Sequence, residues 1–265
     1  MKFSIVANTK QENIREILKK VIGFVDDFEL DKVTASFLGL NGVEIKDLSG
    51  DVIISLGGDG TILHILSQIN KPILGINFGG VGFLNELEPD SDILTAIDNV
   101  IHKKYFEEKL HRIDTYLNDL NVGTAVNEIV LHTSRVAKIQ GFEISTNGKL
   151  IDSFRGDGVI IATPTGSTSY SMSIGAPIIY PTMDSNLIVP MAPYKLGSRP
   201  LILPANYDIS AKINGHPEAV MVIDGKEEIF IKGDDKIEFK ASNNPATLIR
   251  FSKNFFDRLR NKLRL

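Results

Sequence analysis

A glycine-rich segment with a single acidic residue, Gly57-Gly58-Asp59-Gly60-Thr61, contains the residue types that point most directly to chemistry. Glycines allow backbone N–H groups to approach an anion closely, and the first turn of a helix adds partial positive charge. The segment is therefore typical of a phosphate-binding turn. Its spacing matches neither G-x-G-x-x-G nor the lysine-containing P-loop, which argues against hydride transfer and against a P-loop NTPase.

Asp59 is unusual among phosphate-binding glycines, because a carboxylate repels bound phosphates and so needs a role of its own. It can take a proton from an attacking hydroxyl, or it can help to hold a divalent metal on the phosphates. The alternative is structural, in which Asp59 caps the helix that begins here. The segment alone leaves these roles open.

A second glycine-rich segment, residues 75–84, follows the next predicted strand. Ligands bind outside the carboxyl ends of the strands in an open parallel sheet, so the loops after successive strands line one crevice. We therefore expect residues 57–61 and 75–84 to meet. Phe78 and Phe83 are interpreted as core anchors.

A third cluster lies in the second half of the chain, where Arg155-Gly156-Asp157-Gly158 precedes a buried strand and the hydroxyl-rich residues 163–173 follow it. A concentration of short donors and acceptors between apolar stretches suits recognition of a ribose and a base edge, with Tyr170 able to stack. A solvated loop is the alternative.

Asn127 and Glu128 are polar residues inside an otherwise apolar stretch, residues 124–131, which we interpret as one strand. Alternation along a strand directs one of the two toward the core or a cleft, where a buried polar group needs a partner. That partner is either a ligand hydroxyl or the backbone of a neighbouring loop.

Short buried strands and amphipathic helices alternate through the first hundred residues and position the two glycine-rich segments. This order predicts a right-handed, mainly parallel α/β unit. The predicted strands are Phe3–Ala7, Val52–Leu56 and Pro72–Ile76, and the predicted helices cover residues 14–25, 62–69 and 93–101.

The second half of the chain has a different pattern. After about Tyr105 the apolar runs become short and rich in Ile, Val and Thr, which predicts an all-β half. Asn147-Gly148 separates residues 142–146 from residues 150–154 and predicts a two-residue hairpin turn.

The last predicted helix carries an apolar stripe, and basic residues cover the rest of its surface. We expect the stripe to dock on the helix's own domain, and a membrane surface is the alternative. The stripe consists of Phe255, Phe256, Leu259 and Leu263.

The composition excludes several classes of protein. The 265 residues include 29 basic and 33 acidic ones and no cysteine, which excludes disulfides, thiolate metal sites and a catalytic thiol. The acidic balance argues against nucleic acid as the main partner. No apolar run approaches the ~20 residues that span a bilayer, and no signal-peptide core begins the chain, so we expect a cytoplasmic protein without a membrane partner.

Taken together, these segments resemble the NAD kinase family in order and spacing over nearly the whole chain. The resemblance implies a Rossmann-like α/β domain at residues 1–104, completed by a returning segment at 245–265, an all-β domain at 105–244, and a site between them. It implies transfer of the γ-phosphoryl group of ATP to the 2′-hydroxyl of the adenosine ribose of NAD. It also implies a divalent metal, Mg²⁺ brought with ATP, and a homo-oligomer, either a dimer or a tetramer.

The same resemblance suggests site residues, position by position, and it assigns no metal ligand in this chain. Asp59 is similar to the family's catalytic acid/base, and Gly60 to its backbone contact with the dinucleotide. Asp224-Gly225 resembles a late turn of the family that lies near the site. The other residues that resemble dinucleotide contacts are His64, Asn127, Glu128, Lys138, Arg155, Asp157, Thr165, Thr168, Ser169, Tyr170, Ser171, Met172, Ser173 and Ala192.

Two positions depart from the family pattern. Ser169 stands where relatives commonly have Ala, and Ala176 replaces a usual Gly. Neither change removes a charged group, so the implied activity stands, while Ser169 adds a hydroxyl near the base.

Two other functions remain as alternatives. A non-catalytic dinucleotide-binding sensor would gain nothing from a carboxylate at Asp59. A lipid kinase of the diacylglycerol or sphingosine type resembles this family through a similar Gly-Gly-Asp-Gly loop, but it would need an apolar entry groove. The hydroxyl-rich residues 163–173 favour a ligand made of sugar and base.

Overall fold

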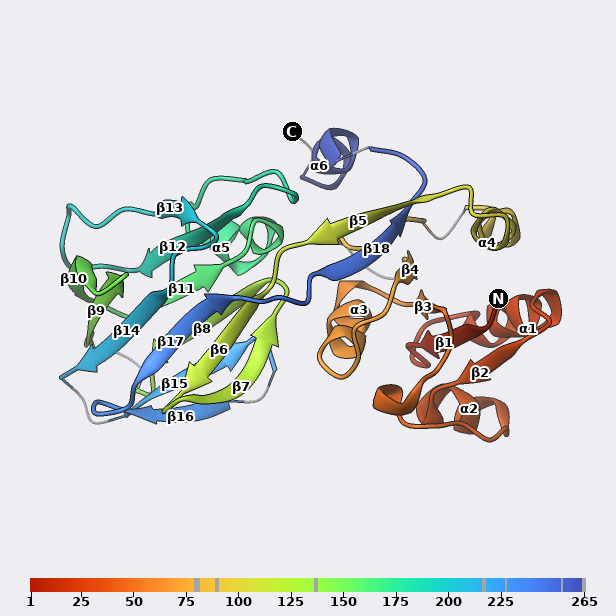
Figure 1. The fold of residues 1–265 in the computed structure, drawn as a ribbon, viewed down its shortest axis with the longest axis horizontal. Helices are drawn as coiled ribbons and strands as arrows, with labels where there is room; N and C mark the ends of the chain where they lie inside the picture. Colours follow the sequence, from red (N-terminus) through yellow and green to blue (C-terminus); the bar gives the residue numbers. More distant parts are fainter. Residues whose placement is uncertain are drawn as a thin grey trace. The chain divides into compact units, whose positions relative to one another are not determined.

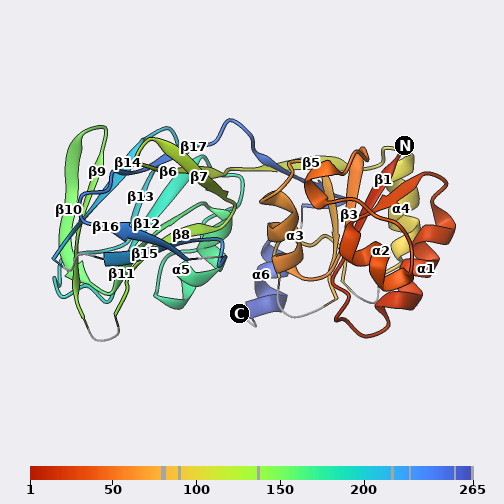
Figure 2. The same ribbon diagram turned by 90° about the horizontal axis from the view of Figure 1, so that it is seen from below.

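The structure is a computed structural model, and it describes residues 1–78, 82–88, 91–135, 138–215, 218–226, 228–253 and 255–263. Internal contacts divide the chain into two compact units. Unit 1 comprises Met1–Lys109 and Ala246–Leu265, and unit 2 comprises Leu110–Pro245. Figures 1 and 2 show the elements of each unit.

Unit 1 contains a sheet with the strand order β2-β1-β3-β4-β18-β5. β1 pairs in parallel with β2 and β3, β3 with β4, and β4 with β18. The strands are β1 (Phe3–Ala7), β2 (Phe28–Leu30), β3 (Val52–Leu56), β4 (Ile73–Ile76), β5 (Phe106–Leu110) and β18 (Ala246–Arg250). The helices are α1 (Ile14–Phe24), α2 (Lys32–Leu38), α3 (Asp59–Leu66), α4 (Ile93–Ile101), α6 (Phe255–Leu263) and the short 3-10 helix η1 (Ile45–Asp47).

Helices cover both faces of this sheet. Ile54 of β3 packs with Leu18 of α1 and Ile97 of α4 in one buried core. The opposite face carries α3, since a Cβ atom placed on Gly75 of β4 would lie 2.7 Å from Cδ1 of Ile62. In both views α3 lies on one side of β3, and α1 and α4 lie on the other (Figures 1 and 2). Every residue of β3 is buried, as a strand covered on both faces requires.

Unit 2 is built from two antiparallel sheets, with the orders β10-β9-β14-β17-β6-β7 and β13-β12-β11-β8-β15-β16. Their inner faces share one core, in which Phe142 of the first sheet packs with Leu131 and Ile161 of the second. The strands are β6 (Ile113–Leu117), β7 (Leu120–Ala125), β8 (Glu128–Thr133), β9 (Gln140–Thr146), β10 (Lys149–Gly156), β11 (Gly158–Ala162), β12 (Ser185–Met191), β13 (Leu201–Pro204), β14 (Ile209–Asn214), β15 (Glu218–Ile223), β16 (Glu228–Lys232) and β17 (Ile237–Ala241). Two short helices complete the unit, η2 (Thr165–Thr168) and α5 (Tyr170–Ser173).

The predicted fold class, an α/β part followed by an all-β part, is confirmed. The predicted hairpin is also present: Asn147 and Gly148 join β9 to β10 with φ values of 47° and 75°. Such a pair of left-handed residues matches the twist of the two strands.

The last helix docks on its own unit, as predicted, but its apolar stripe is only partly buried. No residue of α6 is buried, and Phe256 of the expected apolar stripe is 68% exposed. Arg258 and Lys262, whose side chains are only 11% and 10% exposed, bind the segment 82–88 of the same unit. Phe255, Leu259 and Leu263 of the stripe are half-buried, so ionic contacts add to a partly buried stripe in holding the helix. None of the helices in the described residues has the length and hydropathy needed to cross a membrane.

Candidate active site

The turn after β3 has the geometry expected of an anion-binding turn. β3 ends at Leu56, and α3 begins at Asp59 with Gly58 as its N-cap. Gly58, Gly60, Thr61 and His64 line a cleft of about 660 Å³, together with Asn8, which follows β1. The cleft therefore lies at the carboxyl ends of two neighbouring parallel strands, the position at which open α/β sheets bind ligands.

The side chain of Asp59 does not cap its own helix, so the interpretation of Asp59 as an N-cap is wrong. Its carboxylate reaches across to the segment after β4, where Oδ2 accepts from the backbone N–H of Phe83 at 2.6 Å. Oδ1 accepts from the N–H of Leu84 at 3.1 Å and from the side-chain amide of Asn85 at 2.9 Å. Three donors therefore fix the orientation of the carboxylate.

The two glycine-rich segments meet at Asp59 and Gly82, as predicted. None of the described residues 75–78 and 82–84, however, lines the cleft at the first segment. A Cβ atom at Gly82 would lie 2.4 Å from Oδ1 of Asp59, so only glycine allows this approach. Gly79, Gly80 and Val81, which belong to the same predicted segment, lie outside the described residues. Phe83 is half-buried rather than a fully buried core anchor.

In unit 2 the predicted single strand over residues 124–131 is wrong. The chain turns at Val126 and Asn127, so that β7 belongs to one sheet and β8 to the other. The physical reason is the carboxylate of Asp224, which accepts from three consecutive backbone N–H groups. These belong to Val126 (2.8 Å), Asn127 (2.8 Å) and Glu128 (3.1 Å).

The carbonyl side of the same turn is fixed by the residues after β11. The hydroxyl of Thr163 donates to the carbonyl oxygen of Val126 at 2.6 Å, and its N–H donates to that of Asn127 at 2.9 Å. A Cβ atom at Gly166 would lie 2.1 Å from the carbonyl oxygen of Asn127, so glycine is required there. The turn that presents Asn127 is therefore held from both sides.

Glu128 is a buried carboxyl group with an unusual titration. It is 7% exposed, and burial raises its pKa to about 7. The nearby charge of Asp224 acts in the same direction, whereas the hydrogen bond from the Ser169 hydroxyl to Oε1, at 3.0 Å, opposes the rise in pKa. Near neutral pH, Glu128 can therefore donate or accept a hydrogen bond.

The hydroxyl-rich residues 163–173 are not a solvated loop. Residues 163–167 are buried, and several hydroxyls satisfy the backbone of the turn itself. Ser167 donates to the carbonyl oxygen of Pro164 at 2.6 Å, and Thr168 donates to that of Thr165 at 3.1 Å. Tyr170 is 43% exposed and Ser173 is exposed, while Ser171 is buried and Met172 half-buried.

The remaining predicted residues of unit 2 form a second group. The N–H of Asp157 donates to the carbonyl oxygen of Met191 at 3.0 Å, next to Ala192, which has an unusual φ of 43°. Arg155 is exposed beside Tyr194, and Lys138 is exposed in the loop before β9. Asp157 precedes β11 and Thr163 follows it, so about five residues of strand, roughly 17 Å, separate the two groups.

The sequence pattern missed several charged residues beside these sites. Burial lowers the pKa of Arg112, which is 5% exposed, and the pKa of Lys226. The negative charge of Asp224 acts in the opposite direction on both groups. Arg250, 3% exposed, binds the segment that holds Asp59. The sequence signal for Arg250 was its place at the end of an apolar strand, because a charge that is buried there needs partners.

The described residues offer limited protein ligation to a metal ion. Among them, no three His, Asp or Glu side chains lie close enough together to bind an ion. Asp59 is the carboxylate at the glycine turn, and both its oxygens already accept hydrogen bonds. This donor set fits an ion held mainly by nucleotide phosphates and water, as Mg²⁺ commonly is.

Comparison with known families gives the same assignment in both halves of the chain. The model of the ATP-NAD kinase N-terminal domain matches residues 7–105, and that of the ATP-NAD kinase C-terminal domain matches residues 126–251. An NAD kinase of Methanosarcina mazei is 40% identical over 257 residues, covering 94% of this chain and 88% of that protein. An NAD kinase of Thermoplasma volcanium is 36% identical over 267 residues, covering 99% and 98%.

Solved structures agree with these sequence relatives. A crystal structure of an NAD kinase from Archaeoglobus fulgidus in complex with ATP matches with a TM-score of 0.81 and 26% identity, covering 100% of this chain and 99% of that one. Yeast NADH kinase complexed with NADH matches with a TM-score of 0.89 and 25% identity, covering 99% and 87%. Because family models match both halves and relatives above 30% identity cover most of each sequence, the chain belongs to the ATP-NAD kinase family.

Proposed function

We propose that this chain transfers the γ-phosphoryl group of ATP to the 2′-hydroxyl of the adenosine ribose of NAD, giving NADP and ADP. That it is an NAD kinase, an ATP-dependent phosphotransferase, follows from its family. The observation that carries the finer assignment is the carboxylate of Asp59, which three donors hold at the glycine turn. A fixed carboxylate beside a phosphate-binding turn suits deprotonation of an acceptor hydroxyl.

The proposed reaction is an in-line displacement. Asp59 accepts the proton of the 2′-hydroxyl as the acceptor oxygen bonds to the γ-phosphorus, and the bond from that phosphorus to the β,γ-bridging oxygen breaks. ADP leaves with the bonding electron pair. Backbone N–H groups around Gly58 and Gly60 line the cleft in which the phosphates would lie. Mg²⁺ held by ATP would neutralise charge on the phosphates.

Residues of unit 2 are proposed to bind NAD. Glu128 can both donate to and accept from ribose hydroxyls because its pKa is about 7. Tyr170 is exposed enough to stack on a base. The further proposed contacts in unit 2 are Asn127, Lys138, Arg155, Asp157, Thr165, Thr168, Ser169, Ser171, Met172, Ser173 and Ala192. Gly60 and His64 of unit 1 are also proposed to contact NAD.

A homo-oligomer is part of the proposal, either a dimer or a tetramer. The two groups of predicted residues in unit 2 lie at opposite ends of β11. An oligomer in which two subunits each supply one group to the same dinucleotide would use both. We also propose a cytoplasmic location, because ATP and NAD are abundant there.

The experiment incubates the purified chain with NAD, ATP and Mg²⁺ and follows NADP with an NADP-specific dehydrogenase. We expect NADP to form only when all components are present. NAD binding without NADP would support a sensor instead. If NAD does not bind and diacylglycerol or sphingosine is phosphorylated, the chain is a lipid kinase.

A further inference from the structure

Three consecutive residues, Phe83, Leu84 and Asn85, separate Asp59 from a buried arginine. On one side they donate to the Asp59 carboxylate, through the N–H groups of Phe83 and Leu84 and through the side-chain amide of Asn85. We call these residues the 83–85 segment. Their opposite side faces the C-terminal strand β18.

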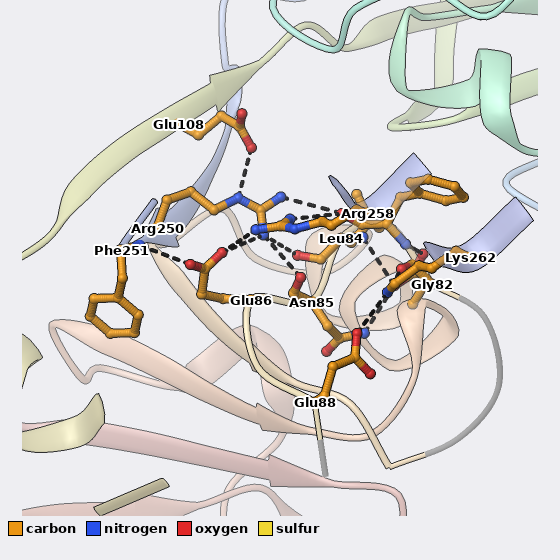
Figure 3. Close-up of polar contacts among 12 residues, drawn as sticks. Gly82, Leu84, Asn85, Glu86, Glu88, Glu108, Arg250, Phe251, Arg258 and Lys262 are labelled. Atoms are coloured by element: carbon orange, nitrogen blue, oxygen red, sulfur yellow. Dashed lines mark hydrogen bonds and ion pairs between the residues drawn. The ribbon is translucent and has the colours of Figure 1, made fainter. Parts of the chain in front are cut away.

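Arg250, the last residue of β18, binds the carbonyl oxygens of the same three residues. Its Nη1 donates to Leu84 at 2.9 Å and to Asn85 at 3.1 Å, and its Nη2 donates to Phe83 at 3.4 Å. Figure 3 shows the guanidinium of Arg250 pointing toward Leu84 and Asn85. All three of these residues thus donate to Asp59 and accept from Arg250.

The guanidinium is itself fixed by two acidic residues. Nε of Arg250 donates to Glu108 at 2.7 Å, and Nη1 lies 3.3 Å from Oε2 of Glu86. Oε1 of Glu86 accepts from the N–H of Phe251 at 2.9 Å (Figure 3). A rigid planar fork with five N–H donors suits such a set of acceptors, whereas a lysine ammonium does not.

Helix α6 adds a second cation to the same segment. Arg258 donates to the carbonyl oxygen of Phe83 at 3.3 Å and forms an ion pair with Glu86. Its pKa is lowered, mainly by burial. The end of the chain therefore holds the 83–85 segment with two guanidinium groups.

We propose that Arg250 is a positioning residue for Asp59, acting through the 83–85 segment. The proposal rests on the proposed function, in which Asp59 accepts the proton of the NAD hydroxyl. The carbonyl oxygen of Phe83 and the N–H of Leu84 belong to one peptide group, so a guanidinium bound to that oxygen polarises the group and strengthens the hydrogen bond from Leu84 to Asp59. Without the Arg250 guanidinium, the segment loses one of its two guanidinium anchors. A displacement of the Asp59 carboxylate by ~1 Å can lower turnover about 100-fold.

The experiment compares wild-type chain with Arg250→Lys in steady-state NADP formation, with NAD affinity measured by calorimetry. Arg250→Lys keeps the charge but cannot reach all the acceptors. We expect kcat to fall about 10-fold to 100-fold, while KM and affinity for NAD change by less than about threefold. An unchanged kcat in the folded variant would overturn the proposal.

A matched control separates positioning from loss of stability. Glu29→Gln removes a partly buried carboxylate from the same sheet, where it binds Lys2 and Ser4 and does not contact the 83–85 segment. We expect Glu29→Gln to lower the melting temperature but to leave kcat of the folded protein unchanged. If Glu29→Gln and Arg250→Lys lower kcat equally, the effect is one of stability and the proposal fails.

A double-mutant cycle tests the route through Asp59. The residual rate is measured as transfer of a labelled γ-phosphoryl group from ATP to NAD. If Arg250 acts through Asp59, adding Arg250→Lys to Asp59→Asn changes this rate by less than about twofold. If the two substitutions lower the rate independently, so that the fold-change of the double variant is the product of the two single fold-changes, the proposal is overturned. Should Arg250→Lys not fold, Arg258→Gln replaces it, with an expected fall in kcat of about 3-fold to 10-fold; unchanged kcat in that variant contradicts the proposal.

The proposed function can fail separately. A wild-type chain that makes no NADP overturns the function, and the assignment of Arg250 falls with it. Wild-type NADP formation together with full kcat in Arg250→Lys overturns only the assignment of Arg250.

Discussion

The hydroxyl of Ser169 donates a hydrogen bond of 3.0 Å to Oε1 of Glu128. Although this bond favours the charged carboxylate, burial has the larger effect, and the pKa of Glu128 is raised to about 7. A carboxyl group that ionises near neutral pH has consequences for stability.

The first prediction concerns stability against pH. The pKa of Glu128 is about 7 in the folded chain and about 4.3 when unfolded, so between these pH values the folded state binds more protons. The free energy of unfolding therefore falls as pH rises from about 4.3 to 7, by at most about 4 kcal/mol, and then levels off. Glu128→Gln lacks this loss. We expect urea unfolding to show the variant gaining stability relative to wild type from pH 5 to pH 8.

Glu218→Gln is the control, because it removes an exposed carboxyl group from the neighbouring strand β15. Its unfolding curve should follow the wild-type curve across the same pH range. A constant difference between Glu128→Gln and wild type would contradict the assigned pKa of Glu128.

The second prediction concerns the turn at residues 126–128. Asp224→Ala leaves three backbone N–H groups without their acceptor, two of them buried. Unsatisfied buried donors cost about 1–3 kcal/mol each, less where water enters, so we expect a loss of about 3 kcal/mol in denaturant unfolding. Asp235→Ala serves for comparison, since Asp235 accepts from Lys232 and Asn118 nearer the surface and should cost about 1 kcal/mol. Equal losses would show that the turn does not depend on Asp224.

The third prediction concerns Tyr170. Because the ring is 43% exposed, Tyr170→Ala should fold normally. Loss of base stacking should raise KM for NAD about 10-fold while KM for ATP changes less than about twofold. Tyr207→Ala, which removes a ring that is 37% exposed elsewhere in unit 2, should change neither constant. An equal rise in both KM values would place Tyr170 outside the dinucleotide site.

Local patterns predicted the parts of the fold that local physics determines. The apolar run at Val52–Leu56, followed by glycines, predicted β3 and the start of α3, since burial on both faces and a helix N-terminus leave short signatures. Asn147-Gly148 predicted its hairpin because few other residues accept two left-handed conformations.

Contacts between distant residues were beyond such patterns. Asp224 binds the turn at Asn127, which lies 97 positions away in the sequence. Arg250 binds Leu84, which lies 166 positions away. The apolar residues around Asn127 therefore predicted one strand, although hydrogen bonds to the distant carboxylate of Asp224 end the strand there. The ionic contacts of α6 were beyond the pattern for the same reason, because the acidic partner of Arg258 lies far away in the sequence.

The measurement that tests the account most directly compares Asp59→Asn with the wild-type chain, in NADP formation and in NAD binding by calorimetry. Asparagine keeps the shape of the side chain but cannot serve as the base. The account predicts that turnover falls by at least about 1,000-fold while NAD affinity stays within about tenfold of wild type. Turnover close to wild type, or loss of NAD binding together with turnover, would contradict it.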